Sequence, residues 1–478
     1  MNMKFRLLNI ALLVGSLLAG NTANAQEQEI LKIGLNEALE IALSENPSIK
    51  IADMEITKKE YSKKSAYGAL MPQVDLIGQY QHTLKRQTMY LDGAFNLMGD
   101  VDPSKFTPEE LKILDVMGRA MAPDENADPN AGIQVGRKNM WTGGVSVSLP
   151  LVVPSLWKNI QMSKIDLELT MEQARSSKIN LTNQVKKAFY NILLAKEGYA
   201  VFKETYTTDS LNFENIKDKY NQGLLAEYDV VTADVRLKGI IPNILQAENM
   251  LIISELQLKM LMGVDADVPM VIEGSLLDFE KSMFETIVPS DESLASNSDL
   301  RQFDLQSSQA RKAYEIQKLQ LLPTLTSSFS YSYMSQNNDF KFNTYRWDPY
   351  SVIGITLAVP IFNGGQRHNA IKQSEIQLFQ LKEQRTDIER GLKLSVKNNI
   401  ELINKNIEQI TATQSAVQQA KKGYEITQKR YETGMGTIVD LNAAALAVTT
   451  TELQYRNAIY DYLAAKADLE KILGYDLN

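Results

Sequence analysis

Apolar and polar residues alternate with a period of two in four short segments of this chain. Such alternation over about 10 residues predicts strands with one apolar and one polar face. The segments come as two pairs, the first within residues 73–150 and the second within 324–360. The residues on the predicted apolar face are Val74, Leu76, Gly78 and Tyr80; Trp141, Val145, Val147 and Leu149; Leu325, Phe329, Tyr331 and Tyr333; and Ile353, Ile355, Leu357 and Val359.

Two very long stretches without proline follow the strand pairs. They cover residues 155–222 and 366–433, and at 1.5 Å per residue each would form a helix about 100 Å long. Gly223 and Gly434 end the helical pattern, as glycine commonly does at a helix C-terminus. A returning helix is predicted after each glycine, over 226–262 and over 437–473.

The last of these helices carries apolar residues at alternating spacings of three and four. This heptad pattern predicts helix-on-helix packing of the coiled-coil type. The matching helix of the first half is less regular, and it contains Pro242. The heptad positions are Ile438, Leu441, Ala445, Val448, Tyr455, Ile459, Tyr462, Leu469 and Leu473, interrupted by Glu452 and Lys466.

The order of elements occurs twice along the chain. Tyr220-Asn221-Gln222-Gly223 matches Tyr431-Glu432-Thr433-Gly434, and Met262-Gly263 matches Leu473-Gly474, at an offset of 211 residues. A unit of this length is too long for a solenoid repeat. We therefore predict an internally duplicated, mainly α-helical chain with strands, in which residues 26–275 form repeat 1 and residues 276–478 form repeat 2.

The first 25 residues have the pattern of a secretory signal peptide. Lys4 and Arg6 precede an apolar run from Leu7 to Ala19, and Ala23-Asn24-Ala25 provides small residues for cleavage. The run is too short for a membrane-spanning helix. The chain has no cysteine, which excludes disulfides and a lipidated cysteine.

Composition argues against several classes of function. The formal net charge is −8, so nucleic acid is not expected as a partner. The two histidines, His82 and His368, and the lack of cysteine give no metal-binding cluster. No GxxxxGK[ST], HExxH or GxSxG motif is present. We expect no enzyme activity, no cofactor and no metal.

A stretch of 18 uninterrupted apolar residues is missing after the signal peptide, so a bilayer would have to be crossed by strands. Four strands cannot close a barrel, and an open sheet edge cannot face lipid. Two chains would give eight strands and a filled interior, whereas three would give twelve and a lumen. A trimer is the smallest closed assembly with a pore.

Two motifs carry a resemblance to a known family. Pro360-Ile361-Phe362-Asn363-Gly364-Gly365 and Tyr431-x-x-Gly434-x-x-Thr437-Ile438-Val439-Asp440, with the duplicated strand pairs, resemble the TolC family of outer-membrane efflux proteins. The resemblance implies a homotrimer with a twelve-stranded barrel in outer membrane lipid and a coiled-coil helical barrel across the periplasm. It also implies a periplasmic adaptor (membrane fusion) protein and an inner-membrane transporter as partners.

The function implied is an outer membrane channel of a tripartite efflux or type I secretion system. Such a channel is a passive exit duct gated at its periplasmic end. The alternative is a structural or adhesive coiled-coil protein of the cell surface. That alternative accounts for the heptads and the signal peptide, but not for strand pairs repeated in matching positions.

The resemblance also points to residues of a periplasmic gate. Asp440 matches an aspartate of the family's acidic ring, while Ala443 stands where a second acidic residue is expected. Asp229 and Tyr431 match gating contacts, and Gly436 replaces an arginine near the tip. The alternative is that Asp440 only stabilises the N-terminus of its own helix.

Glycine and proline mark the turns and junctions. Proline has no N–H to donate to a strand ladder, so we expect Pro150 and Pro360 to end their strands. The first repeat has Val152-Val153-Pro154-Ser155 in place of the glycines of the second. The predicted tip turns contain Gly223, Gly434 and Gly436, and the predicted strand-to-helix junctions contain Pro150, Pro360, Gly364 and Gly365.

Two further segments each leave two interpretations open. Thr107-Pro108-Glu109-Glu110 predicts a helix start within the inserted segment 86–139, which is either a lid above the barrel or an acidic loop. An aromatic group near the second strand pair is either an interfacial girdle or a packed loop. Its members are Phe340, Phe342, Tyr345, Trp347 and Tyr350.

Overall fold

The computed structural model describes residues 31–89, 102–121, 133–282 and 291–475. The chain is mainly helical with some sheet, as predicted, and it divides into two compact units. Unit 1 comprises residues 1–60, 165–309 and 378–478, and unit 2 comprises 61–164 and 310–377. The predicted signal peptide lies outside the described residues.

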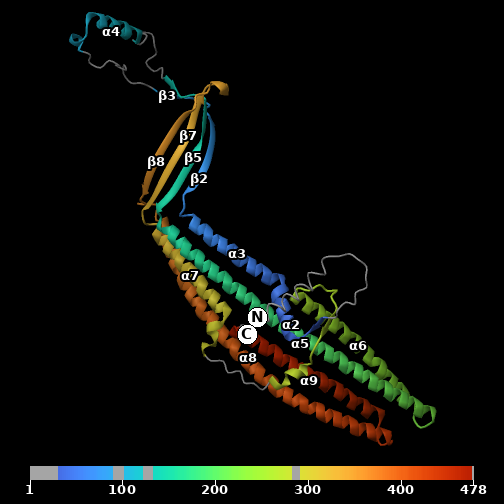
Figure 1. Ribbon diagram of the computed structural model, residues 1–478. Helices are drawn as coiled ribbons and strands as arrows, with labels where there is room; N and C mark the ends of the chain where they lie inside the picture. Colours follow the sequence, from blue (N-terminus) through green and yellow to red (C-terminus); the bar gives the residue numbers. More distant parts are fainter. Residues whose placement is uncertain (1–30, 90–101, 122–132, 283–290, 476–478) are drawn as a thin grey trace, which may run out of the picture. The chain divides into compact units, whose positions relative to one another are not determined.

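Unit 2 is built around one antiparallel sheet, whose strands lie side by side in the order β2-β5-β7-β8 (Figure 1). Each of the four segments with an alternating pattern is a strand of this sheet, although the two pairs are far apart in the sequence. The strands are β2 (Gln73–His82), β5 (Asn139–Val152), β7 (Thr324–Asn337) and β8 (Asp348–Ala358).

The register brings the apolar positions of all four strands to one face. Val74 is opposite Val147, Val147 is opposite Phe329, and Phe329 is opposite Ile353. Residues directly opposite in an antiparallel pair share a face of the sheet. The next row, on the other face, is Asp75, Ser146, Ser330 and Val352.

The prediction that Pro150 ends its strand is wrong. β5 continues to Val152, and Pro150 lies opposite Thr326 of β7. Pairing with β2 stops at Ser148, so β5 beyond that point is paired on one side only, where a missing N–H is tolerated. The register shifts between Pro150 and Val152, so the pairing with β7 is irregular there. The first strand-to-helix junction is therefore at Pro154, the first residue of α5.

The second junction follows the expected order. β8 ends at Ala358 and α8 begins at Gln366, with Pro360 between them. Gly364 and Gly365 have φ angles of 64° and 80°. The first junction has Val152-Val153-Pro154 instead, so the two halves connect strand to helix in different ways.

The aromatic residues near the second strand pair form a packed cluster in part. The centres of the Tyr80 and Trp141 rings lie 4.2 Å apart. Phe342 approaches Trp141 edge-on at 5.3 Å, and its ring is tilted against that of Tyr345 at 5.0 Å. Phe340 lies 6.3 Å from Tyr80. These contacts join the loop after β7 to the ends of β2 and β5, which favours the packed-loop interpretation for Phe340, Phe342 and Tyr345.

The inserted segment of unit 2 contains the predicted helix. α4 (Pro108–Met121) begins with reciprocal bonds: Thr107 N donates to Glu110 Oε2 at 2.9 Å, and Glu110 N donates to Thr107 Oγ1 at 3.3 Å. Two short strands of the same segment, β3 (Gln87–Met89) and β4 (Ile133–Val135), pair in antiparallel orientation. Residues 90–101 and 122–132 of this segment lie outside the described part.

Unit 1 is formed by helices, and two of them return along the long helices α5 and α8 (Figure 1). The predicted long and returning helices differ from the observed ones by at most one residue at either end. α3 and α7, like α5 and α8, have residues in both units. The helices are α2 (Leu35–Glu45), α3 (Pro47–Gly68), α5 (Pro154–Asn221), α6 (Glu227–Met262), α7 (Ser298–Leu319), α8 (Gln366–Glu432) and α9 (Ile438–Leu473).

The sequence did not predict a small parallel pair, β1 (Leu31–Ile33) with β6 (Met270–Ile272), which lies at one side of the core. Each of these strands has three residues, too few to show a period. Short 3-10 helices complete the chain: η2 (Pro103–Lys105), η3 (Leu276–Ser282), η4 (Asp291–Ser296) and η5 (Phe342–Thr344).

The core of unit 1 confirms most of the heptad pattern of α9. Seven of its nine positions are buried, while Ala445 and Val448 are half-buried. Phe189 and Leu193 of α5 belong to the same core. The apolar residues of α6 are less uniformly buried, because Leu258 and Met262 are buried but Ile241 is 40% exposed.

A chain of ion pairs explains why Glu452 interrupts the heptads. Its carboxylate lies 2.6 Å from Lys421 Nζ of α8 and also pairs with Arg456 one turn further along α9. Arg456 Nε lies 3.1 Å from Glu197 of α5, whose other oxygen accepts a bond from Leu276 N at 2.8 Å. Burial opposes the charge, but bonds from Lys421 and Arg456 hold the pKa of Glu452 below its usual value.

Candidate functional site at the helix turns

The two helix-to-helix turns of unit 1 have the same geometry. Leu224 N donates to Lys219 O at 2.8 Å, and Met435 N donates to Arg430 O at 2.8 Å. These are six-to-one bonds of the Schellman type, which need a left-handed residue just before the donor. Gly223 and Gly434 supply it, with φ angles of 75° and 76°.

Gly436 serves the second turn through its lack of a side chain. A Cβ atom there would lie 3.2 Å from Tyr431 N and 3.3 Å from Arg430 Cβ. These separations are tighter than ordinary van der Waals contact, so any larger residue, including the arginine of the resembled family, would require a small shift of the turn. In this chain, Gly436 therefore lets the backbone between α8 and α9 pack closely against Arg430 and Tyr431.

Asp440 forms a reciprocal cap at the start of α9. Its Oδ2 accepts hydrogen bonds from Thr437 Oγ1 at 2.8 Å and from Thr437 N at 3.2 Å, and Asp440 N donates to Thr437 Oγ1 at 3.1 Å. The bonds from the Thr437 side chain and backbone lower the pKa of Asp440. The carboxylate is exposed and remains charged at neutral pH.

Asp229 and Tyr431 lie at the same end of unit 1. Asp229 Oδ2 accepts a bond from Ala226 N at 3.3 Å in the first turn of α6. Within the described residues, the Tyr431 hydroxyl is buried without a hydrogen-bond partner. Burial, and then the negative charge of Asp229, raise the pKa of Tyr431 to about 12. The pair is electrostatically coupled, but no hydrogen bond joins the two side chains here.

A small apolar cluster holds the turns against each other. Ile216 of α5, Ala233 of α6, and Ile438 and Leu441 of α9 are buried together, and Tyr431 packs against them. Ile438 and Leu441 flank Asp440 in the sequence. The position of Asp440 is therefore set by the packing of the first α9 turn, as well as by its own cap.

A buried ion pair next to this cluster was not predicted. Arg236 Nε of α6 donates to Asp209 Oδ1 of α5 at 2.9 Å, and Arg236 Nη1 donates to the backbone oxygen of Asn442 of α9 at 2.5 Å. The Asp209 side chain is 5% exposed. Its burial raises the pKa, while Arg236 opposes that shift. The two residues are on different helices, so no sequence spacing connects them.

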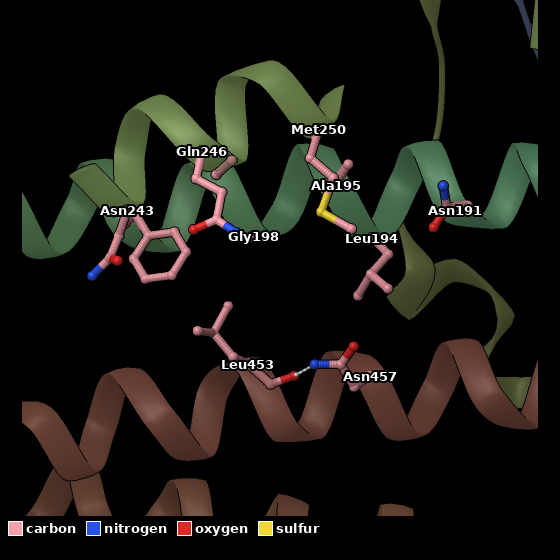
Figure 2. A pocket seen from close by; sticks show the side chains of 11 residues that line it. Asn191, Leu194, Ala195, Gly198, Asn243, Gln246, Met250, Leu453 and Asn457 are labelled. Carbon is pink, nitrogen blue, oxygen red and sulfur yellow. Dashed lines mark hydrogen bonds between the residues drawn. The ribbon is translucent and has the colours of Figure 1, made fainter. Parts of the chain in front are cut away.

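Farther from the turns, α5, α6 and α9 leave a cavity of about 240 Å³ between them (Figure 2). In Figure 2, Gln246 of α6 and Leu453 of α9 approach from opposite sides, next to Gly198 of α5. Amide and apolar side chains share the lining, and the Asn457 side-chain amide is bonded to Leu453 O at 2.8 Å. No charged residue lines this cavity, so it offers no acid–base chemistry.

No group of three or more His, Cys, Asp or Glu side chains that could hold a metal ion occurs within the described ranges. No described helix is both long enough and apolar enough to cross a membrane. The features at the turns are caps, an electrostatically coupled tyrosine and a buried ion pair. Features of this kind fix the positions of helix ends relative to one another.

Comparison with known proteins identifies the family. A family model described as outer membrane efflux protein matches residues 38–264 and 290–475, and the chain belongs to this family. Membership implies an outer membrane location. The alternative of an adhesive or structural coiled-coil protein is not supported.

Individual relatives are distant in sequence. The outer membrane protein TolC of Vibrio cholerae serotype O1 is 24% identical over 343 residues, which is 70% of this chain and 77% of that protein. Among solved structures, VceC of Vibrio cholerae superimposes with a TM-score of 0.68 at 14% identity, covering 92% of this chain and 96% of VceC. The CmeC outer membrane channel of Campylobacter jejuni gives 0.68 at 17% identity, covering 92% and 85%. These two likenesses show the fold.

Proposed function

We propose that three copies of this chain form a passive exit duct, with a twelve-stranded barrel in the outer membrane and a helical barrel extending into the periplasm. A periplasmic adaptor and an inner-membrane transporter would complete the export system. The transporter would supply the energy, so the duct itself requires no catalytic group.

The sheet of unit 2 is the observation that carries this proposal. Within the described residues, β2 pairs with β5 alone and β8 pairs with β7 alone, so both outer strands have an unpaired edge. Apolar side chains of β8 are exposed on one face, with Ile353 78% and Ile355 71% exposed. Copies of the chain would pair the edges, the apolar face would meet lipid, and the serine-rich face would line the lumen.

The helices support the rest of the assembly. α5 has 68 residues and α8 has 67, long enough for a deep periplasmic extension. α6 exposes a row of apolar side chains at helical spacing, which neighbouring copies would cover. The row is Val231, Val235, Leu245, Ile252, Leu256 and Met260.

Matching turns, caps and helix lengths support an internal duplication of the chain. The two Schellman turns are 211 residues apart, and the helices on either side of them have nearly equal lengths. A trimer of duplicated chains would place six similar helix hairpins around one axis. The strand-to-helix junctions, with Pro360, Gly364 and Gly365 in the second half, would connect the barrel to these helices.

The turns would form the gate. In a trimer, three Asp440 carboxylates would approach one axis and attract cations at a narrow point. The Tyr431 ring packs against the apolar cluster at the turns, and Asp229 lies near enough for its charge to raise the pKa of Tyr431, so the packing of the ring and the charge of Asp229 would contribute to the closed state. Ala443 carries no charge, so a second acidic ring would be missing at that level.

The test is the mass of the complex in detergent extracts of separated outer membranes, measured after crosslinking. A trimer in that fraction is expected, and it should conduct ions in planar bilayers. A monomer, or protein found only in the soluble periplasmic fraction, would contradict the proposal.

A further inference from the structure

Arg236 joins three helices through one planar group. Its Nε bonds the Asp209 carboxylate of α5 at 2.9 Å, and its Nη1 bonds the Asn442 backbone oxygen of α9 at 2.5 Å. A guanidinium has five donors in a fixed plane and can serve both acceptors at once, whereas a lysine ammonium is a compact point charge.

Burial makes this contact hard to replace. The side chains of Arg236 and Asp209 are 18% and 5% exposed. Within the described residues, the second oxygen of Asp209 is buried without a hydrogen-bond partner, so Arg236 carries most of the compensation for that charge. Removing one member of a buried pair leaves the other uncompensated, which costs far more than breaking a surface pair.

The second acceptor, the Asn442 carbonyl, connects the ion pair to the candidate gate. Asn442 follows Asp440 by two residues, and its carbonyl lies within the first turns of α9. Leu441, between them, is buried against Ile216 and Ala233. The start of α9 is thus attached to α5 and α6 by apolar packing and by one polar bond from Arg236.

We infer that Arg236 is a positioning residue for the gate: by joining Asp209 to the Asn442 carbonyl, it holds the first turns of α9, and with them Asp440, in the closed arrangement. This inference rests on the proposed channel function. The contact lies within one protomer and requires no side chain at Gly436.

The experiment compares Arg236→Met with Lys238→Met in the full-length protein. Lys238 is on the same helix and pairs with Asp234 at 2.7 Å, but its side chain is 71% exposed, which makes it a matched control. Hydrogen exchange of the first three turns of α9 should become at least about tenfold faster in Arg236→Met. The single-channel conductance of the trimer should rise at least about threefold, and Arg236→Lys should lie between.

A second variant separates positioning from folding. Asp209→Leu combined with Arg236→Met removes both buried charges and restores apolar packing, yet leaves α9 without the bond at Asn442. We expect a stable trimer whose conductance is still raised. If Arg236→Met alone does not assemble, the conductance of this double variant shows whether Arg236 positions α9.

Two results would overturn the inference while the channel proposal stands. One is exchange in α9 equal to that of Lys238→Met, and the other is faster exchange with unchanged conductance, which would make Arg236 a stabilising residue only. A wild-type protein that neither forms a trimer nor conducts ions would instead remove the channel proposal, and this inference with it.

Discussion

Thr437 and Asp440 cap each other at the start of α9, whereas the equivalent position in α6 is occupied by Ala226. Thr437 Oγ1 both donates to the Asp440 carboxylate and accepts from Asp440 N, at 2.8 and 3.1 Å. Asp229 retains one half of this arrangement, a bond of 3.3 Å from Ala226 N. The starts of α6 and α9 therefore differ by one side-chain cap.

Exchanging these caps should change stability in opposite directions. Thr437→Ala should lower the free energy of unfolding by about 1 kcal/mol, and Ala226→Thr should raise it by a similar amount. Ala226 is exposed with extended backbone angles, φ −81° and ψ 154°, which threonine adopts readily. Urea titration followed by circular dichroism measures both. Equal effects of the same sign would show that the caps do not govern these helix starts.

The charge of Asp440 should persist to low pH. Hydrogen bonds from Thr437 lower its pKa from the ordinary 3.8. The stabilisation from this carboxylate is therefore present above the unfolded pKa and is lost as the pH falls through the lowered one. Cation selectivity of the channel should therefore stay constant as the pH falls from 7 to the ordinary carboxyl pKa of 3.8, and should decrease only below it. Asp440→Asn should show weak selectivity throughout, and a wild-type midpoint near pH 6 would disprove the assignment.

Ile353 and Val352 test which face of the sheet meets lipid. Ile353 shares the apolar face with Phe329, whereas its neighbour Val352 shares the polar face with Ser330. A lysine on a lipid face costs about 2–4 kcal/mol near the bilayer midplane. Ile353→Lys should sharply reduce the trimer recovered from outer membranes, and Val352→Lys should leave it nearly unchanged. Equal losses in both variants would contradict the assignment of faces.

Alanine substitutions at two glycines should have opposite effects, one stabilising the protein and the other disrupting it. In helical α5, a Cβ at Gly198 would meet Leu453 Cδ2 at 3.9 Å, beside the cavity of Figure 2, so Gly198→Ala should stabilise by about 0.5–1 kcal/mol. In β5, a Cβ at Gly144 would lie 2.5 Å from Ser332 Cα, where no atom fits. Gly144→Ala should therefore lower trimer assembly. Urea midpoints and trimer yields give the comparison.

Tyr431→Phe examines a hydroxyl that has no hydrogen-bond partner among the residues the structure describes. Burying such a group is unfavourable, so its removal should leave the free energy of unfolding unchanged or raise it by up to about 1 kcal/mol. The conductance should remain that of the wild type. A less stable, more conductive variant would show that the hydroxyl bonds a neighbouring copy in the closed trimer.

Much of the fold could be predicted because its signals are local. Alternation in strands such as 324–337 and the heptads of α9 depend on the repeat of one element, and Gly223 and Gly434 end helices through their own backbone angles. The same logic failed at Pro150, because whether a strand tolerates proline depends on which of its edges is paired at that residue.

The sequence by itself determined the four strands, the long helices and their turns, and the family to which the chain belongs. It also singled out Asp440, Asp229 and Tyr431, but it did not show which of them form hydrogen bonds. The tertiary structure decided that one sheet gathers the apolar positions of all four strands on a single face. It also decided that Asp209, Arg236 and Asn442 meet. These contacts join segments that are far apart in the sequence. Their stability depends on burial and hydrogen-bond geometry, which cannot be predicted from a local sequence pattern.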